Sequence, residues 1–192
     1  SLEQLDVDFI KLYDSKLNGG LFLSAVKKSK ARGFKSSGHM PFSVTLNQAL
    51  DAGMNGIEHL YYILKGSSKN ELEITQQIQS GALGFWQAMP LLINSYDDAK
   101  AKSLFKKLKQ QEVFVIPTLY IGNTLSYLDE NDHSNDEYLN KLSPDFKMTY
   151  ERRIKSALNS SQETRSNRKK LDTLFGELAL KLHESGFLFQ LH

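Results

Sequence analysis

The sequence contains no cysteine. Disulfides and thiolate metal sites are therefore excluded as features of this chain. It also lacks any apolar run near the ~20 residues that a membrane-spanning helix needs, so we expect no membrane partner. Proline is scarce, at 4 residues in 192, while 40% of the residues are hydrophobic and 24% are charged. That balance is typical of a globular protein and excludes disordered and fibrous classes.

An excess of either charge is also missing. The chain has 24 basic and 22 acidic residues, which gives a net charge of +2. So small an imbalance predicts no binding to nucleic acid. The densest basic run, residues 165–170, is predicted to be the solvated face of a helix. Composition does not fix a cellular compartment, with the cytoplasm slightly favoured.

Hydrophobic periodicity along the chain changes repeatedly between that of strands and that of helices. Alternating or continuous apolar segments predict strands at 6–13, 34–39, 54–60 and 113–119, with another beginning at Phe187. Helical spacing predicts helices at 21–31, 43–52, 68–93, 96–110 and 144–185, with a long polar loop at 120–143 that contains a short helix. Strands that alternate with helices indicate an α/β fold with a parallel sheet.

Polar side chains able to bind a metal come at the ends of three successive predicted strands. They are Lys11, His39 and His59. Taken singly, a lysine there is usually solvated, and a histidine is often a loop or core residue. In a parallel sheet, however, the carboxyl ends of the strands share one rim, where ligands bind. Neighbouring strands lie about 4.8 Å apart, so these three side chains can converge on one point.

Three segments carry a resemblance to a known family: VDFIKLY (7–13), GHMPFSVTLNQALDAGMNGIEHL (38–60) and VFVIPTL (113–119). They resemble the amidohydrolase superfamily, in its imidazolonepropionase-like and prolidase-like branch. The resemblance implies a partial (β/α)8 TIM barrel, about strands four to eight, as a single domain over residues 1–192 that is truncated at both ends. It also implies hydrolysis of C–N bonds in amides, cyclic amides or dipeptides by metal-activated water.

The same resemblance implies roles for individual residues. Lys11 would be carbamylated and would bind a divalent metal, with zinc preferred, together with His39 and His59. A bare ammonium cannot ligate a cation, so Lys11 serves only in a modified or neutral form. Tyr61 and Tyr120 follow strand ends and are candidates for binding a small-molecule or dipeptide substrate.

Two parts of the family pattern are not found. The 192 residues contain no His-X-His pair, and no aspartate follows the presumed last strand near 186–190. We therefore assign no catalytic residue and expect the chain alone to be inactive. A non-catalytic α/β binding or assembly module remains the alternative. A flavodoxin-like fold is disfavoured, because residues 15–20 lack a phosphate-binding loop pattern. Exposed sheet edges would favour self-association.

Overall fold

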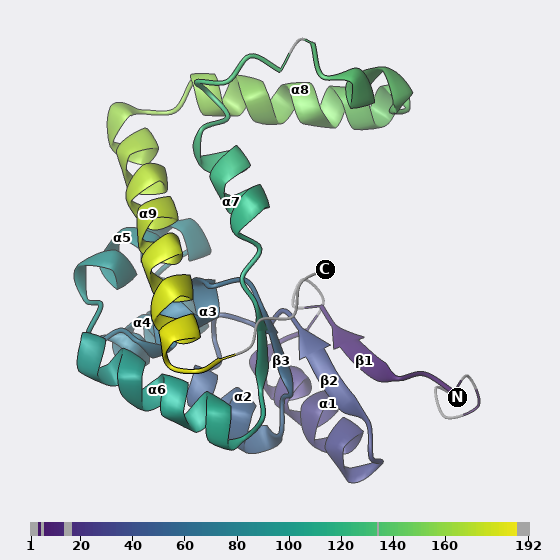
Figure 1. Cartoon of the computed structure of the whole chain (residues 1–192), viewed down its shortest axis with the longest axis vertical. Coiled ribbons are helices and arrows are strands. Elements are labelled where there is room, and N and C mark those ends of the chain that lie inside the picture. The colour runs from purple at the N-terminus through teal and green to yellow at the C-terminus, as the bar shows by residue number, and fades with distance from the viewer. Residues whose placement is uncertain (1–3, 5, 14–16, 134, 188–192) are drawn as a thin grey trace. The chain divides into compact units, whose positions relative to one another are not determined.

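A parallel sheet organises the structure, a computed structural model that describes residues 4, 6–13, 17–133 and 135–187. Within those residues its strands are β1 (Phe9–Leu12), β2 (Lys35–Gly38), β3 (Gly56–Glu58) and β4 (Phe114–Ile116), side by side in chain order (Figure 1). Every neighbouring pair is parallel. The predicted α/β class with a parallel sheet is confirmed, while its closure as part of a barrel stays a prediction.

Helices fill every connection between the strands, as parallel pairing requires. The first two connections hold α1 (Gly19–Ala31) and α2 (Leu46–Ala52). The third holds α3 (Tyr61–Gly66), α4 (Glu71–Gln79), α5 (Phe85–Asn94) and α6 (Asp98–Gln110). After β4 come α7 (Leu119–Ser126), the 3-10 helix η3 (Glu137–Lys141), α8 (Pro144–Leu158) and α9 (Gln162–Glu184).

Side-chain caps decide where the helices next to the site begin. The Asn18 side chain accepts a hydrogen bond from the backbone N–H of Leu21, so α1 starts at Gly19, two residues before the helix predicted at 21–31. Thr45 and Gln48 form a reciprocal capping box, which starts α2 at Leu46 and not at Ser43 as expected. Gly53, at φ 104°, closes that helix in a left-handed conformation.

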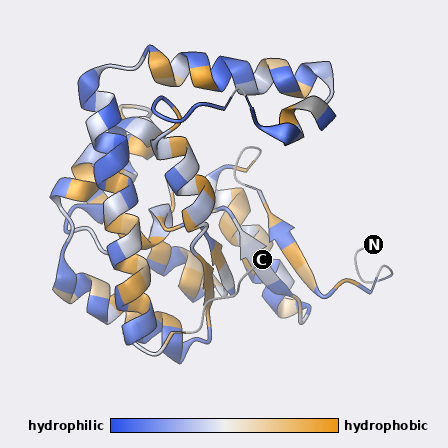
Figure 2. Cartoon of the chain, turned by 45° about the horizontal axis from the view of Figure 1, so that its top comes forward, coloured by the Kyte–Doolittle hydropathy of each residue, from blue (hydrophilic) through white to orange (hydrophobic). Residues whose placement is uncertain are grey.

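The core lies where the helices meet the sheet. Ile57 and Val115, from the two neighbouring strands β3 and β4, are fully buried, as are Phe22 and Val26 of α1 and Leu108 of α6. Figure 2 shows hydrophobic and hydrophilic residues alternating along the helices around the sheet. This amphipathic pattern is what allows each helix to bury one side and expose the other. Among the described residues, no helix is both long and apolar enough to cross a membrane.

The chain divides into two compact units. The first comprises residues 1–118 and 174–192, and it contains the sheet and the last part of α9. Leu178 and Leu182 of α9 are fully buried there. Lys181 of the same helix forms an ion pair with Asp98 at the start of α6, with 2.7 Å between Nζ and Oδ1.

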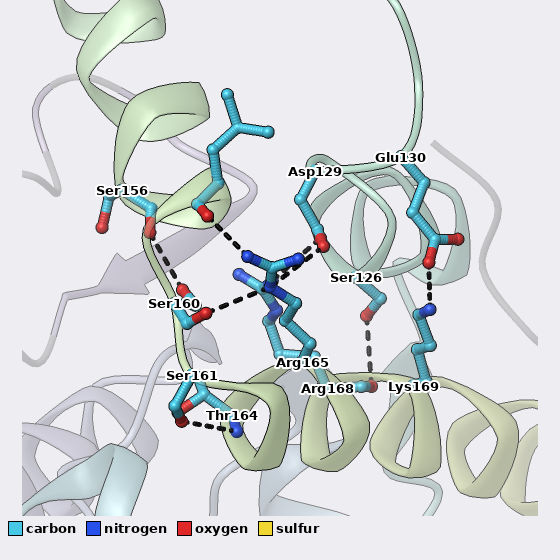
Figure 3. Close-up of polar contacts among 11 residues, drawn as sticks. Ser126, Asp129, Glu130, Ser156, Ser160, Ser161, Thr164, Arg165, Arg168 and Lys169 are labelled. Atoms are coloured by element: carbon cyan, nitrogen blue, oxygen red, sulfur yellow. Dashed lines mark hydrogen bonds and ion pairs between the residues drawn. The ribbon is translucent and has the colours of Figure 1, made fainter.

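The second unit, residues 119–173, is helical and is held by ion pairs (Figure 3). The Asp129 carboxylate is nearly buried, with 2% of its side chain exposed. It binds the Arg168 guanidinium at 2.9 Å and that of Arg165 at 3.5 Å. Lys169 pairs with Glu130. The basic run at 165–170 is thus not simply a solvated helix face, because three of its cations are paired with acidic residues of the same unit.

Two sequence expectations differ from the structure in this second half of the chain. The helix predicted over 144–185 is two helices, since α8 ends at Leu158 and α9 begins at Gln162. The loop predicted at 120–143, with one short helix expected in it, contains most of α7 and all of η3. Apolar residues in α7 have helical spacing, but the many Asn, Asp and Gly residues that surround them favoured a loop. The strand expected from Phe187 onward lies almost wholly outside the described residues.

Candidate metal-binding site

A close approach of two strands places the first histidine. Gly38 ends β2 opposite Leu12 of β1, with φ at 130°. A Cβ added at Gly38 would lie 2.1 Å from the carbonyl oxygen of Leu12, so only glycine fits. The backbone N–H of His39 then donates to that carbonyl oxygen at 3.1 Å. His39 is thereby fixed directly beyond the end of the strand.

Left-handed backbone conformations place the remaining residues. His59 follows β3 with φ at 70°, and Thr118 follows β4 with φ at 51°. Both values are uncommon for residues other than glycine and store strain, which occurs frequently at functional sites. In a regular strand, successive side chains point to opposite faces. The turn at His59 breaks that alternation, so Glu58 and His59 both reach the same cluster.

His39, Glu58 and His59 form this cluster, in which one ligand atom from each lies within 4.8 Å of the others. The Nε2 atoms of the two imidazoles are 2.7 Å apart. The Oε2 atom of Glu58 lies 3.5 Å from Nε2 of His39. The Glu58 and His39 side chains are only 13% and 14% exposed. Two imidazole nitrogens and one carboxylate are a donor set that zinc and related divalent ions accept.

The contact with Thr118 fixes the orientation of the His59 ring. The Thr118 hydroxyl donates to the carbonyl oxygen of Pro117 at 2.8 Å, and its oxygen lies 2.7 Å from Nδ1 of His59. Since a hydroxyl carries one hydrogen, Nδ1 of His59 must be the donor in the second contact. Nε2 is then the nitrogen of His59 that faces His39. An imidazole held in this way has the form of a metal ligand.

The His39 imidazole is largely enclosed by the residues around it. Its Nδ1 atom is buried and has no hydrogen-bond partner among the described residues. The Tyr13 ring packs edge-on against the imidazole, with ring centroids 4.6 Å apart. A histidine that served only as a core residue would normally satisfy its buried nitrogen. The converging Nε2 atoms fit a divalent metal at the cluster, whereas the orphaned Nδ1 points away from it.

Lys11 reaches the cluster through Glu58. Its Nζ atom lies 2.9 Å from Oε1 of Glu58, and its side chain is 50% exposed. It is the third residue of β1, one place before the end of that strand. The common rim predicted for Lys11, His39 and His59 is therefore present, with Glu58 between the lysine and the imidazoles. Sequence reasoning missed Glu58, because strand alternation assigns it to the face opposite His59.

The two tyrosines predicted to bind substrate lie in different units. Tyr61 begins α3 in the first unit, where its ring centroid is 6.1 Å from that of His59. Its ring also packs edge-on against Phe85 and Phe175. Burial raises the pKa of the Tyr61 phenol above its usual value. Tyr120 belongs to α7 in the second unit and is 87% exposed. Substrate binding by either residue remains a prediction.

A buried lysine ties together the segments that follow the two histidines. Lys65 of α3 is fully buried and donates to the carbonyl oxygen of Val44 at 2.8 Å, and to that of Phe42. Burial lowers the pKa of Lys65 to about 8, and the nearby Glu71 carboxylate opposes that shift. Because Phe42 and Val44 come soon after His39, and Lys65 soon after His59, this contact holds together the two segments that follow these histidines.

Comparison with known proteins finds a similarity of fold to a solved structure. No protein-family model matches the chain, and no curated protein matches it. Among solved structures, the chain is similar to a bottromycin amidohydrolase, with a TM-score of 0.55 and 20% sequence identity. The match covers 97% of this chain and 37% of that protein, so this chain spans just over a third of its length. At this identity the similarity shows an amidohydrolase-like fold.

Proposed function

We propose that this chain carries part of the active site of a metal-dependent amidohydrolase, which hydrolyses a C–N bond in an amide, cyclic amide or dipeptide. The observation that carries the proposal is the convergence of the His39 and His59 Nε2 atoms, 2.7 Å apart, at the carboxyl ends of two parallel strands. That rim is where α/β proteins of this architecture bind their ligands. The amidohydrolase-like fold supports the same chemistry.

His39 and His59 would hold the metal through neutral imidazole nitrogen. The third ligand is an oxygen donor, which the family resemblance assigns to a carbamylated Lys11. A bound divalent metal supplies Lewis-acid activation of water at near-neutral pH. The chain's own residues orient the ligands: Thr118 fixes the His59 tautomer, and Gly38 fixes the backbone at His39. Tyr61, beside His59, would contact the substrate.

We further propose that the 192-residue chain is inactive by itself, because it contains no His-X-His pair. A partial site with two imidazoles would still bind metal. Metal binding therefore distinguishes the proposed function from its alternative, a non-catalytic binding or assembly module. Such a module has no need for two converging imidazoles at strand ends.

Metal analysis tests the proposal directly. Purified protein dialysed against zinc should bind one ion per cluster, and His39→Ala and His59→Ala should each lose it. His183→Ala is the matched control, because that histidine lies in the last turn of α9. Equal zinc content in all four proteins, or none in the unaltered chain, would refute the proposed function.

A further inference from the structure

We propose that Glu58, and not a carbamylated Lys11, supplies the oxygen ligand beside His39 and His59, and that Lys11 acts as an ammonium that positions Glu58. This inference rests on the proposed function, because it concerns the ligands of the same metal. It assigns Glu58 a role that the sequence did not indicate, and it changes the role of Lys11 from ligand to positioning residue.

The two carboxylate oxygens of Glu58 contact different residues, and the inference rests on this difference. Oε1 lies 2.9 Å from Nζ of Lys11, while Oε2 lies 3.5 Å from Nε2 of His39. One oxygen is therefore held by the lysine, and the other faces the imidazoles. Metal-binding carboxylates are commonly oriented in this way by a second hydrogen-bonding group.

Exposure distinguishes the carboxylate from the amine. The Glu58 side chain is 13% exposed, close to the 14% of His39, whereas the Lys11 side chain is 50% exposed. The acid is thus enclosed with the imidazole, and the lysine approaches from the edge. A carboxylate that is already enclosed with the imidazoles is therefore better placed than the exposed amine to complete a site of two nitrogens and one oxygen.

Charge argues against carbamylation in this arrangement. Carbamylation first requires the Lys11 ammonium to lose a proton; the neutral amine then attacks carbon dioxide, forms an N–C bond and releases a second proton, so a cationic side chain becomes an anionic one. The attraction between Lys11 and Glu58 across 2.9 Å would then become repulsion between a carbamate and a carboxylate, which the charge of the bound cation would have to offset. The ammonium form keeps a charge-assisted hydrogen bond to Glu58 and leaves the other oxygen of the carboxylate free.

The backbone explains how Glu58 comes to be there. Glu58 is the last residue of β3, in register with Ile116, and His59 follows with φ at 70°. This left-handed turn lets consecutive side chains serve one site, which a regular strand forbids. The strain at His59 is therefore accounted for by the need to present two adjacent ligands.

Substitution of Lys11 by arginine distinguishes a site in which Glu58 is the oxygen ligand from one in which carbamylated Lys11 is. Arginine keeps a cation that can pair with Glu58, but its guanidinium is not available as a free amine for carbamylation. We expect zinc affinity, measured by competition with a chromophoric chelator, to stay within about threefold of the unaltered chain in Lys11→Arg, and to fall about tenfold in Lys11→Met. Glu58→Gln should weaken it by about 100-fold or more, and Glu73→Gln, an exposed control on α4, should not.

Bicarbonate provides a second, independent readout. We expect zinc affinity to be the same in carbon dioxide-depleted and bicarbonate-supplemented buffer, and carbon-13 NMR with labelled bicarbonate to show no carbamate. A carbamate signal that Lys11→Arg abolishes, with zinc binding that bicarbonate strengthens and Glu58→Gln retains, would overturn the inference and leave the proposed function standing. If the unaltered chain binds no zinc under either condition, both fail together.

Discussion

The hydroxyl oxygen of Thr118 lies 2.7 Å from Nδ1 of His59, although 59 residues separate them in the chain. Both residues sit in left-handed conformations just after neighbouring parallel strands. Because the threonine hydrogen is directed to Pro117, the contact makes Nδ1 the donor and turns Nε2 of His59 toward His39. A residue outside the proposed ligand set thereby decides which nitrogen of His59 faces the cluster.

Thr118→Val tests this orienting role. The two side chains have nearly the same shape, so the variant removes the hydrogen bond while it keeps the packing. We expect zinc affinity to fall about tenfold, as it commonly does when a partner of a ligating histidine is lost. Thr118→Ser keeps the hydroxyl and should restore affinity. Equal affinities for the valine and serine variants in chelator competition would show that Thr118 does not orient His59.

Gly38→Ala should destabilise the first unit strongly. Its Cβ would collide with the Leu12 carbonyl oxygen, and φ at 130° is a conformation that alanine rarely adopts. We expect the free energy of unfolding in urea to fall by about 3 kcal/mol or more. Gly176→Ala is the matched control, because that glycine lies within α9 with open space around it. It should raise stability by about 0.5–1 kcal/mol.

The pattern of the sequence predicted the parallel α/β sheet and the rim that carries Lys11, His39 and His59, because strand alternation and strand ends are local signals. Glu58 and Thr118 were not predicted, since their roles depend on left-handed backbone at non-glycine residues, which no sequence pattern marks. The burial of Lys65 was also missed. A lysine at the end of a short helix is usually solvated, and only the tertiary contacts with Phe42 and Val44 reveal otherwise.

The buried Lys65 predicts an increase in stability at alkaline pH. Its pKa is lowered from 10.5 to about 8 in the folded protein. Between those values the unfolded state binds more protons at this residue, so the free energy of unfolding rises as pH increases through the window. The lysine contributes a rise of up to about 3 kcal/mol, complete near the unfolded value.

Urea unfolding of Lys65→Met across the same pH window measures that contribution. The difference between the unaltered chain and the variant should grow as pH rises, because all other titrating groups are shared. Lys102→Met, at an exposed position of α6, should leave the pH dependence unchanged. A difference that stays constant with pH would show that Lys65 titrates normally in the folded state.

Asp129 is expected to be essential for the stability of the second unit. Asp129→Asn removes the charge that pairs with Arg165 and Arg168 and leaves two guanidinium groups without their acid (Figure 3). Because the two arginine side chains are 40% and 23% exposed, water compensates part of the loss, and we expect a cost of about 2 kcal/mol, less than for a fully buried pair. Glu130→Gln, whose carboxylate is 49% exposed, should change stability by less than about 1 kcal/mol. Limited proteolysis within 119–173 compares the two, and equal cleavage rates would contradict the expectation.

Trp86, the single tryptophan of the chain, lies on α5 in the first unit, with its ring edge-on to those of Tyr61 and Phe85. Its indole is 66% exposed, so its emission is sensitive to solvent and to quenchers. Residues 119–173 have no such fluorophore, whereas helices in both units contribute to circular dichroism. Thermal unfolding of one sample, followed by Trp86 fluorescence and by circular dichroism, therefore shows whether the two units unfold in a single cooperative transition or one after the other.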